Sequence, residues 1–335
     1  RFHRNRRKRR NSRIGQLTTG GRKRMRLGAI ALALIAGCVT LGCQSTVNAP
    51  AVTTAARVSP PLVPPVKSEI SQELEAYYST VQSRLLSQGL LRVDGGGPDT
   101  PFTADMLANN FMRIALFEEY AKVGGQMVAK QTPSYLHRWE EPVRLKIEFG
   151  PSVPQQIRTK DHTRVNRLVS RLGRATGHPV SEVTEDANFH VFVVNESERH
   201  ALKSRIRAIV PGISDAAVMK VTRMPRSHYC IAFAWDPDDS GTYREAVAII
   251  RAEHPDLMRL SCLHEEIAQG FGLSNDSPKA RPSVFNDDEE FGLLTHHDEL
   301  LLKMLYDDRL TPGMTPGEAA PIVQTLAREL VGGAG

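Results

Sequence analysis

The sequence has little positive charge outside one short segment, although its overall composition suggests otherwise. The 335 residues carry a formal net charge of +6. Residues 1–26 contain twelve Lys or Arg and no Asp or Glu, which leaves 31 basic against 37 acidic residues in 27–335. Nucleic-acid-binding domains depend on basic residues that neutralise phosphates. The charge distribution therefore excludes nucleic acid as a partner of the body of the chain.

Three further absences narrow the functions that the chain can have. The longest apolar run, Leu27–Gly42, has about sixteen residues, fewer than the roughly twenty that a membrane-spanning helix needs. The glycine-rich segment Asp94–Asp99 lacks the Gly-Lys-Ser/Thr ending of a phosphate-binding loop, so we interpret it as a turn. No histidine pattern accompanies Cys230 or Cys262, which disfavours a catalytic cysteine.

The first 43 residues are typical of an export signal. Leu27–Gly42 follows a cluster of Lys and Arg and contains small residues near its end, as a signal peptide does. Two cysteines compete as the lipidation site. Cys38 follows the more typical side chains, Ile-Ala-Gly, whereas Cys43 has the better distance from Met25 and a polar continuation. We expect residues 1–43 to be a basic export and lipoprotein signal, with a lipid anchor at Cys43 or Cys38 that holds the protein to a membrane of the cell envelope, facing the periplasm. An ordinary cleaved signal is the alternative.

The remaining chain divides into a tether and a body. Residues 44–67 contain five prolines and are predicted to be an extended tether. Helical spacing of apolar residues predicts a helical segment over 68–130, with its second helix over about 103–123. Strands are predicted at 143–149, 189–194, 229–235 and 246–250, and helices at about 165–176, 255–271 and after Thr295 and Thr315. This order predicts an α+β domain over 139–331.

Cys230 and Cys262 both lie in the body. In an oxidising periplasm such an isolated pair is expected to form a disulfide, with two buried free thiols as the alternative.

The helix predicted over 255–271 carries the pattern that bears most on function. Reading from Glu265 gives Glu265-Glu266-x-x-Gln269-x-x-Gly272-x-x-Asn275. This layout resembles the metzincin zinc-peptidase pattern His-Glu-x-x-His-x-x-Gly-x-x-His, in which two ligands lie four residues apart on one helix face. The resemblance puts Glu265, Gln269 and Asn275 at the metal-ligand positions and Glu266 at the position of the catalytic general base, while Gly272 falls at the sharp turn. All three histidines are absent.

Two resemblances extend beyond this helix. Ser283–Asn286 resembles the metzincin segment that carries the Met-turn, with Phe285 in place of Met, and residues 294–306 resemble the helix that follows it. A broader resemblance, to an uncharacterised proteobacterial lipoprotein family (domain of unknown function 2927), spans most of residues 68–330. It is carried by Asp94–Phe102, Glu265-Glu266-x-x-Gln269, Asn275-Asp276, Ser283–Asp287 and Leu310–Met314. This family implies an envelope location and an unassigned function.

The resemblances together imply an α+β domain with a metzincin-like mixed sheet, preceded by a helical N-terminal segment. Zinc favours His, Cys and carboxylate ligands, whereas one carboxylate and two amides suit a hard cation better. We therefore expect a non-catalytic metallopeptidase-like domain that binds a peptide, a glycan or an envelope protein, with no cofactor. One alternative is a metal-dependent hydrolase with a divalent ion and unusual ligands such as His264, Asp276, His296 or His297. Another is a purely structural envelope protein, in which Glu265, Glu266 and Gln269 form a solvated helix face. In a further hypothesis, the helical region 68–128 covers the cleft and Asp94 or Asp99 reaches in.

Overall fold

The computed structural model describes residues 67–123 and 126–332, and between 118 and 131 it describes the course of the backbone alone. The predicted signal, Cys38, Cys43 and nearly all of the predicted tether lie outside the described residues. Those described belong to one unit, Pro61–Gly335. Within them, no helix is long and apolar enough to cross a membrane.

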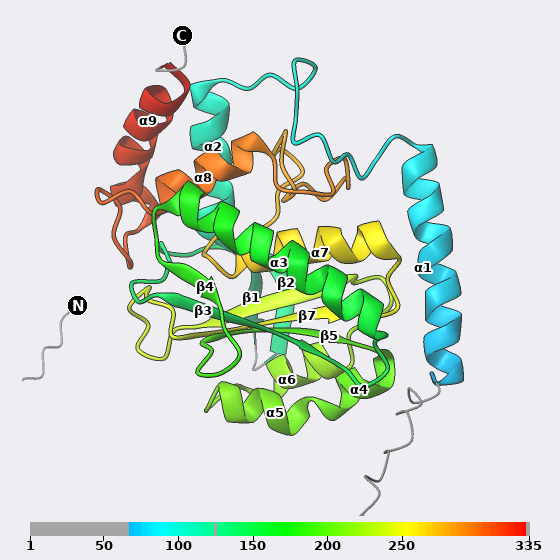
Figure 1. Ribbon diagram of the computed structural model, residues 1–335. Coiled ribbons are helices and arrows are strands. Elements are labelled where there is room, and N and C mark those ends of the chain that lie inside the picture. Colours follow the sequence, from blue (N-terminus) through cyan, green and yellow to red (C-terminus); the bar gives the residue numbers. More distant parts are fainter. Residues whose placement is uncertain (1–66, 124–125, 333–335) are drawn as a thin grey trace, which may run out of the picture. The chain divides into compact units, whose positions relative to one another are not determined.

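Figure 1 shows the elements in chain order. The helices are α1 (Glu69–Ser87), α2 (Ala104–Ala115), α3 (Gln155–Thr176), α4 (Glu196–Ala201), α5 (Lys203–Ile209), α6 (Asp215–Thr222), α7 (Asp256–Gln269), α8 (His296–Leu305) and α9 (Pro316–Gly332). The strands are β1 (Phe117–Val123), β2 (Gln126–Pro133), β3 (Val143–Phe149), β4 (Val180–Glu182), β5 (Phe189–Val194), β6 (Cys230–Trp235) and β7 (Glu245–Arg251). The described part is thus a mixed α+β structure.

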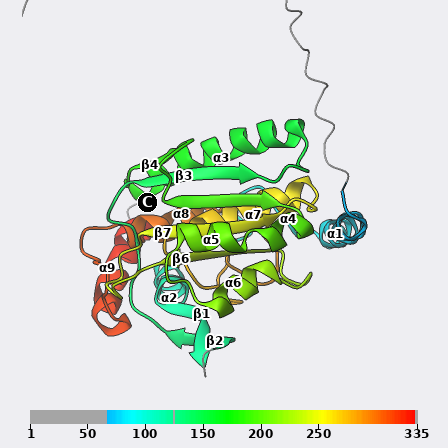
Figure 2. The same cartoon turned by 90° about the horizontal axis from the view of Figure 1, so that it is seen from below.

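The central sheet has five strands in the described part, in the order β4-β3-β5-β7-β6. The first four run parallel, and β6 runs antiparallel to β7 at one edge. Helices α3, α7 and α8 lie over one face of this sheet, and α4, α5 and α6 lie over the other; Figure 2 shows the sheet from the side of α5 and α6. Parallel strands need long crossover connections, and helices cover both faces of this sheet (Figure 1).

Alternating side chains of the central strands fill two separate cores. In β5, Val191 and Val193 join the core under α3 and α7, whereas Phe192 and Val194 join the core under α5 and α6. β7 alternates in the same way. Successive side chains of a strand point to opposite faces, so a strand covered on both faces is mostly apolar. All six residues of β5 are buried accordingly.

Most of the predicted elements are present. The strands predicted at 143–149 and 189–194 have those bounds. β6 begins one residue later than predicted, and β7 is one residue longer than predicted at each end. The predicted helix stop at Gly177 is the left-handed C-cap of α3, a conformation that glycine adopts readily. Thr295 and Asp298 form the predicted capping box of α8.

The predicted helical segment 68–130 needs a correction, because its helices end at Ala115. α2 ends at Ala115, and Phe117–Val123 and Gln126–Pro133 form the antiparallel strand pair β1–β2 instead. Gly124-Gly125 in the sequence is a hairpin signal that the prediction did not consider.

α1 packs on the domain as part of its body. Tyr78, Val81 and Leu85 form a buried cluster with Met258 of α7. Tyr78 also donates a hydrogen bond to the carbonyl of Arg226 (3.0 Å). The hypothesis that this region reaches into a cleft through Asp94 or Asp99 finds no support in its contacts, because both carboxylates pair with Arg92 at an exposed position.

Candidate functional site

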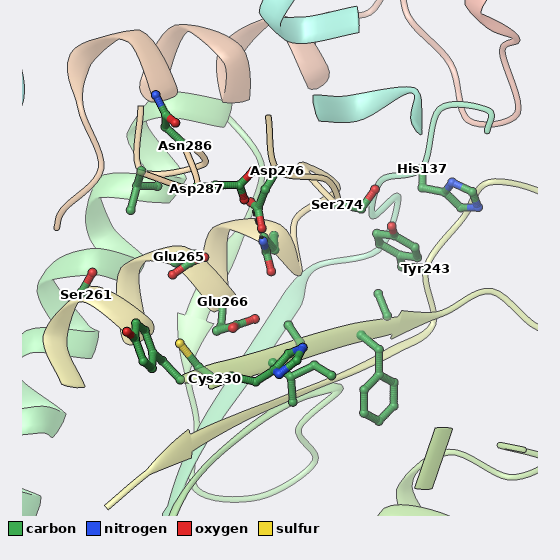
Figure 3. Close-up of a pocket in the computed structure, with 18 of the residues that line it drawn as sticks. His137, Cys230, Tyr243, Ser261, Glu265, Glu266, Ser274, Asp276, Asn286 and Asp287 are labelled. Carbon is green, nitrogen blue, oxygen red and sulfur yellow. Dashed lines mark hydrogen bonds between the residues drawn. The ribbon is translucent and has the colours of Figure 1, made fainter. Parts of the chain in front are cut away.

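A cavity of about 750 Å³ lies between β6, the C-terminal half of α7 and the segment 274–289 (Figure 3). Its lining comprises residues 227–236, Asp239 and Tyr243 from β6 and its flanks, Ser261, Glu265, Glu266 and Gln269 from α7, Ser274, Asp276, Val284, Asn286, Asp287 and Glu289 from the following segment, and Tyr135 and His137. Every residue of the edge strand β6 is included. The cavity is therefore a cleft along the edge of the sheet.

α7 directs one stripe of side chains at this cavity. Ser261, Glu265 and Gln269 follow one another at four-residue spacing, which places them on one helix face. Glu266 lies beside this stripe, and its side chain points into the cavity from above β6 (Figure 3). The predicted disulfide is present: Cys262 of α7 is bonded to Cys230 of β6. The bond ties the helix to the edge strand along one wall of the cavity.

Glycine is required where the chain leaves α7. Gly272 has a φ of +121°, and a Cβ atom there would lie 2.2 Å from the carbonyl oxygen of His137. A Cβ atom at Gly270 would lie 2.3 Å from the ring of Phe189. The indole of Trp139 donates a hydrogen bond to the Gly270 carbonyl (2.8 Å). This close packing turns the chain sharply and brings residues 274–276 back beside α7.

The structure brings three of the four predicted site residues together and places the fourth elsewhere. Glu265, Glu266 and Gln269 line the cavity. Asn275 is buried, with 2% of its surface exposed, and donates from Nδ2 to the carbonyl of Arg113 at the end of α2 (2.8 Å). It does not line the cavity. The neighbouring Asp276 does, and its Oδ1 accepts a hydrogen bond from Gln269 Nε2 (3.0 Å).

The residues at the ligand positions do not fit zinc. The cavity offers Glu265 and an amide, Gln269, which is a poor zinc ligand and is engaged by Asp276. His264 lies on another face of α7 and accepts a hydrogen bond from the Leu294 amide (3.3 Å). Burial lowers the pKa of His264 to about 3, so it is neutral. No group of three His, Cys, Asp or Glu side chains suited to a metal ion occurs among the described residues.

The other histidines considered as ligands also lie away from the cavity. His297 is completely buried, and its Nε2 is 3.2 Å from Nδ2 of Asn110 on α2. His296 is exposed at the first position of α8. Asp276 is thus the one residue of that alternative set that the structure places at the cavity wall.

The loop 283–286 is held beneath the cavity by a buried carboxylate. Asp298 of α8 accepts hydrogen bonds from the Ser283 hydroxyl (2.5 Å), the Val284 amide (3.0 Å) and the Thr295 amide (2.9 Å). Phe285 is fully buried in the main core. These contacts fix Val284 and Asn286 at the cavity wall.

Carboxylates gather at both ends of the cavity. Asp236 and Asp239 lie at the end near His137, whose ring stacks on Tyr135 and Tyr243 at centroid distances of 4.4 Å and 5.3 Å. Asp287 and Glu289 lie on the segment after α7. Burial, together with Asp287 and Asp288, raises the pKa of Glu289 to about 7. Burial also raises the pKa of Asp287.

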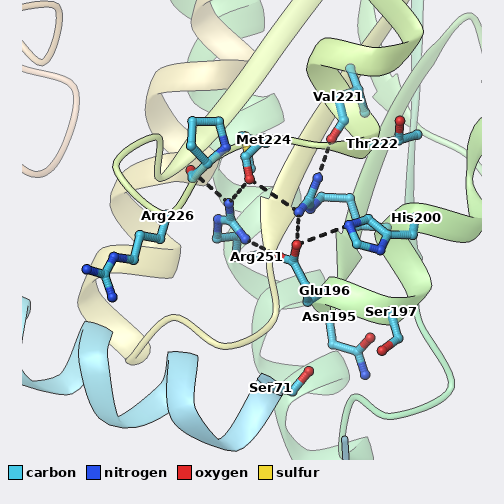
Figure 4. A network of polar contacts seen from close by, with 12 residues as sticks. Ser71, Asn195, Glu196, Ser197, His200, Val221, Thr222, Met224, Arg226 and Arg251 are labelled. Atoms are coloured by element: carbon cyan, nitrogen blue, oxygen red, sulfur yellow. Dashed lines mark hydrogen bonds and ion pairs between the residues drawn. The ribbon is translucent and has the colours of Figure 1, made fainter. Parts of the chain in front are cut away.

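A buried ion network fixes the chain that leads into β6 (Figure 4). Arg251 of β7 pairs with Glu196 (2.6 Å) and donates to the carbonyls of Met224 (2.7 Å), Pro225 (3.0 Å) and His228 (3.2 Å). Arg199, fully buried, pairs with the same Glu196 carboxylate. Sequence reasoning missed this network, because its partners are mostly main-chain carbonyls. The network sets the position of Ser227 and His228 at the cavity wall.

Most of the body of the chain matches one protein family. The family model described as "Protein of unknown function (DUF2927)" matches residues 104–325, more than half of the chain. The chain belongs to this family. No curated protein and no solved structure is significantly similar to it.

Proposed function

We propose that this family member is an exported, lipid-anchored envelope protein whose metallopeptidase-like domain binds a polypeptide segment in the cavity along β6 without cleaving it. The observation that carries the proposal is the placement of an entire edge strand in the wall of a large cavity. A cavity of about 750 Å³ is within the size range of ligand-binding sites.

The edge strand explains why a polypeptide is the favoured ligand. β6 pairs with β7 on one side, and no strand in the described part of the chain pairs with its other side. The main-chain groups along such an edge recognise an extended peptide by adding it as a further strand. Ala232 and Ala234 share a sheet face with Cys230, which is bonded to α7. Their small side chains leave room between β6 and α7.

The likeness to a metallopeptidase is supported by how distant segments are arranged. The segments that resemble the metzincin pattern in sequence, namely α7 with Gly272, the loop 283–286 and α8, all lie around one cavity or support its wall. The mixed sheet beside α7 ends in the antiparallel edge strand β6, which lines the cavity. The segments that resemble metzincin segments in sequence are thus neighbours in the fold.

We infer that the bound polypeptide is not cleaved, because the side chains at the metal-ligand positions do not suit zinc. A peptidase zinc needs three protein ligands and an open position. Here Asn275 contributes to the packing of the turn against α2, and Gln269 is an amide. Glu266 stands at the general-base position but has no zinc-bound water to act on.

The envelope location is supported by the export-type sequence of residues 1–43 and by the disulfide. Disulfides persist in oxidising compartments such as the periplasm. Metabolic labelling with radioactive palmitate tests the anchor. We expect the wild-type protein to be labelled. Loss of the label in either Cys43→Ala or Cys38→Ala identifies the acylated residue. An unlabelled wild-type protein refutes the anchor.

Affinity selection tests the binding function. The purified chain is incubated with a pool of random decapeptides, and the retained peptides are identified by mass spectrometry. We expect intact peptides to be retained, and retention to be lost in Ala232→Trp, which fills the cavity. Ala201→Trp, an equal change at the exposed end of α4, serves as the matched control. If no peptide is retained, or if Ala232→Trp retains peptides as wild type does, the proposal is wrong. Retention of oligosaccharides instead identifies a glycan-binding protein.

A metal-dependent hydrolase is the second candidate, and the position of Asp276 favours it. Asp276, Glu265 and Gln269 present oxygen ligands at one cavity wall, and oxygen ligands suit Ca²⁺, Mg²⁺ or Mn²⁺. Stoichiometric metal by elemental analysis, together with cleavage of the peptide pool that disappears in Glu266→Gln, supports this candidate. The absence of both from a folded protein refutes it.

A further inference from the structure

The lining of the cavity is strongly asymmetric in charge. Seven of its described residues are Asp or Glu, and none is Lys or Arg. Five of the seven, Asp236, Asp239, Asp276, Asp287 and Glu289, lie outside the pattern that suggested a peptidase. A concave surface with charges of one sign attracts and orients ligands of the opposite sign. The ligand of this cavity is therefore expected to be cationic.

One end of the cavity has a carboxylate whose main chain is fixed in position. Glu289 lies in a left-handed backbone conformation with a φ of +59°. Its main chain is fixed on both sides: its carbonyl accepts a hydrogen bond from the Leu91 amide (2.8 Å), and its amide contacts the carbonyl of Asn286 (3.4 Å). The carboxylate of Glu289 is thus held at the cavity wall with Asp287 two residues away.

The arginines near this loop pair with Glu290 and not with Glu289. Arg92 and Arg281 both pair with Glu290, at 3.2 Å and 2.6 Å. The charged groups that act on Glu289 are the carboxylates of Asp287 and Asp288, both of which raise its pKa. Tyr229 of the cavity wall also lies within electrostatic range of Glu289 and is neutral at physiological pH, because burial raises its pKa further. A desolvated carboxylate beside like charges is unfavourable until a cation binds.

We propose that the polypeptide bound in the cavity carries an arginine or lysine whose side chain enters the end formed by Asp287, Glu289 and Tyr229. This inference rests on the polypeptide binding proposed above and specifies the class of ligand. An extended segment along β6 supplies main-chain hydrogen bonds, which do not depend on sequence. The acidic end supplies selection for a basic residue, because charge complementarity confers specificity.

Four decapeptide pools test the inference. They are identical except that one position is fixed as arginine, lysine, citrulline or glutamate; citrulline has the shape of arginine without its charge. Binding to the full chain is measured by fluorescence anisotropy at low and high salt. We expect the arginine and lysine pools to bind roughly tenfold tighter than the citrulline pool at low salt, which corresponds to about 1.4 kcal/mol. The preference should shrink as salt screens the charges.

Substitutions in the protein test where the basic residue of the peptide binds. Glu289→Gln removes one charge at the proposed position and should abolish most of the preference for arginine over citrulline. Asp308→Asn makes the same change in net charge at an exposed residue outside the cavity and should leave the preference intact. Circular dichroism confirms that both variants are folded.

The outcomes separate this inference from the function on which it rests. Equal binding of the arginine and citrulline pools refutes the basic specificity but leaves polypeptide binding in place. If Glu289→Gln leaves the preference unchanged, the basic residue of the peptide binds elsewhere and the proposed position is refuted. If no pool binds, both proposals fail. Displacement of the arginine pool by stoichiometric Ca²⁺ assigns the acidic end to a metal ion and also refutes the inference.

Discussion

Replacing Glu289 by glutamine should stabilise the protein by an amount that grows as the pH rises from about 4.5 to about 7. Burial and two neighbouring carboxylates raise the pKa of Glu289 from its ordinary value of 4.5 to about 7. A carboxyl group whose pKa is raised by folding favours the folded state while it is protonated. That contribution is fully present below about pH 4.5 and is lost as the pH rises through 7. Above pH 7 the ionised side chain destabilises the fold, and the difference between the two pKa values corresponds to about 3 kcal/mol.

Urea unfolding at pH 5 and pH 8 measures the effect. Glutamine resembles the protonated carboxyl group in shape, and the left-handed backbone strain at this position is present in both proteins, so the substitution isolates the charge. We expect Glu289→Gln to raise the free energy of unfolding by less than about 1 kcal/mol at pH 5 and by about 3 kcal/mol at pH 8. Asp308→Asn should change neither value by more than about 0.5 kcal/mol. An effect of equal size at both pH values, or a less stable variant at pH 8, refutes the reasoning.

Three further substitutions test how the cavity wall is built. Gly272→Ala should lower the free energy of unfolding by about 3 kcal/mol or more, because its Cβ atom would clash with a main-chain carbonyl. Gly177→Ala should cost only about 1 kcal/mol, because its Cβ atom meets nothing within 4 Å; equal losses would contradict the proposed clash. Asp298→Ala removes a buried acceptor of three hydrogen bonds and should cost about 3–5 kcal/mol in urea unfolding; a loss below about 1 kcal/mol would show that it does not hold the loop. Replacing both Cys230 and Cys262 by serine should cost about 3–4 kcal/mol, because the disulfide closes a loop with a sequence separation of 32 residues; an unchanged midpoint would mean that the bond does not stabilise the fold.

The local features of the fold were readable from the sequence because their causes are local. The alternation in 143–149 and the largely apolar, strand-like run 189–194 predicted β3 and β5 with the bounds that they have. A glycine at 177 and a Thr-x-x-Asp sequence at 295–298 predicted a helix end and a helix start, because each satisfies main-chain groups within one turn. Cys230 and Cys262 are the two cysteines of the body, which made them the expected disulfide pair.

The composition of the cavity was decided by the tertiary structure. Asn275 and Asp276 are adjacent, and the sequence pattern favoured the first. Contacts with α2, 160 residues earlier in the chain, hold the backbone and the side chain of Asn275 outside the cavity and so leave Asp276 at its wall. Asp236, Glu265 and Glu289 belong to segments that no local pattern connects. Their meeting depends on the antiparallel placement of β6 and on the turn after α7, both of which are fixed by long-range packing that a single sequence does not display.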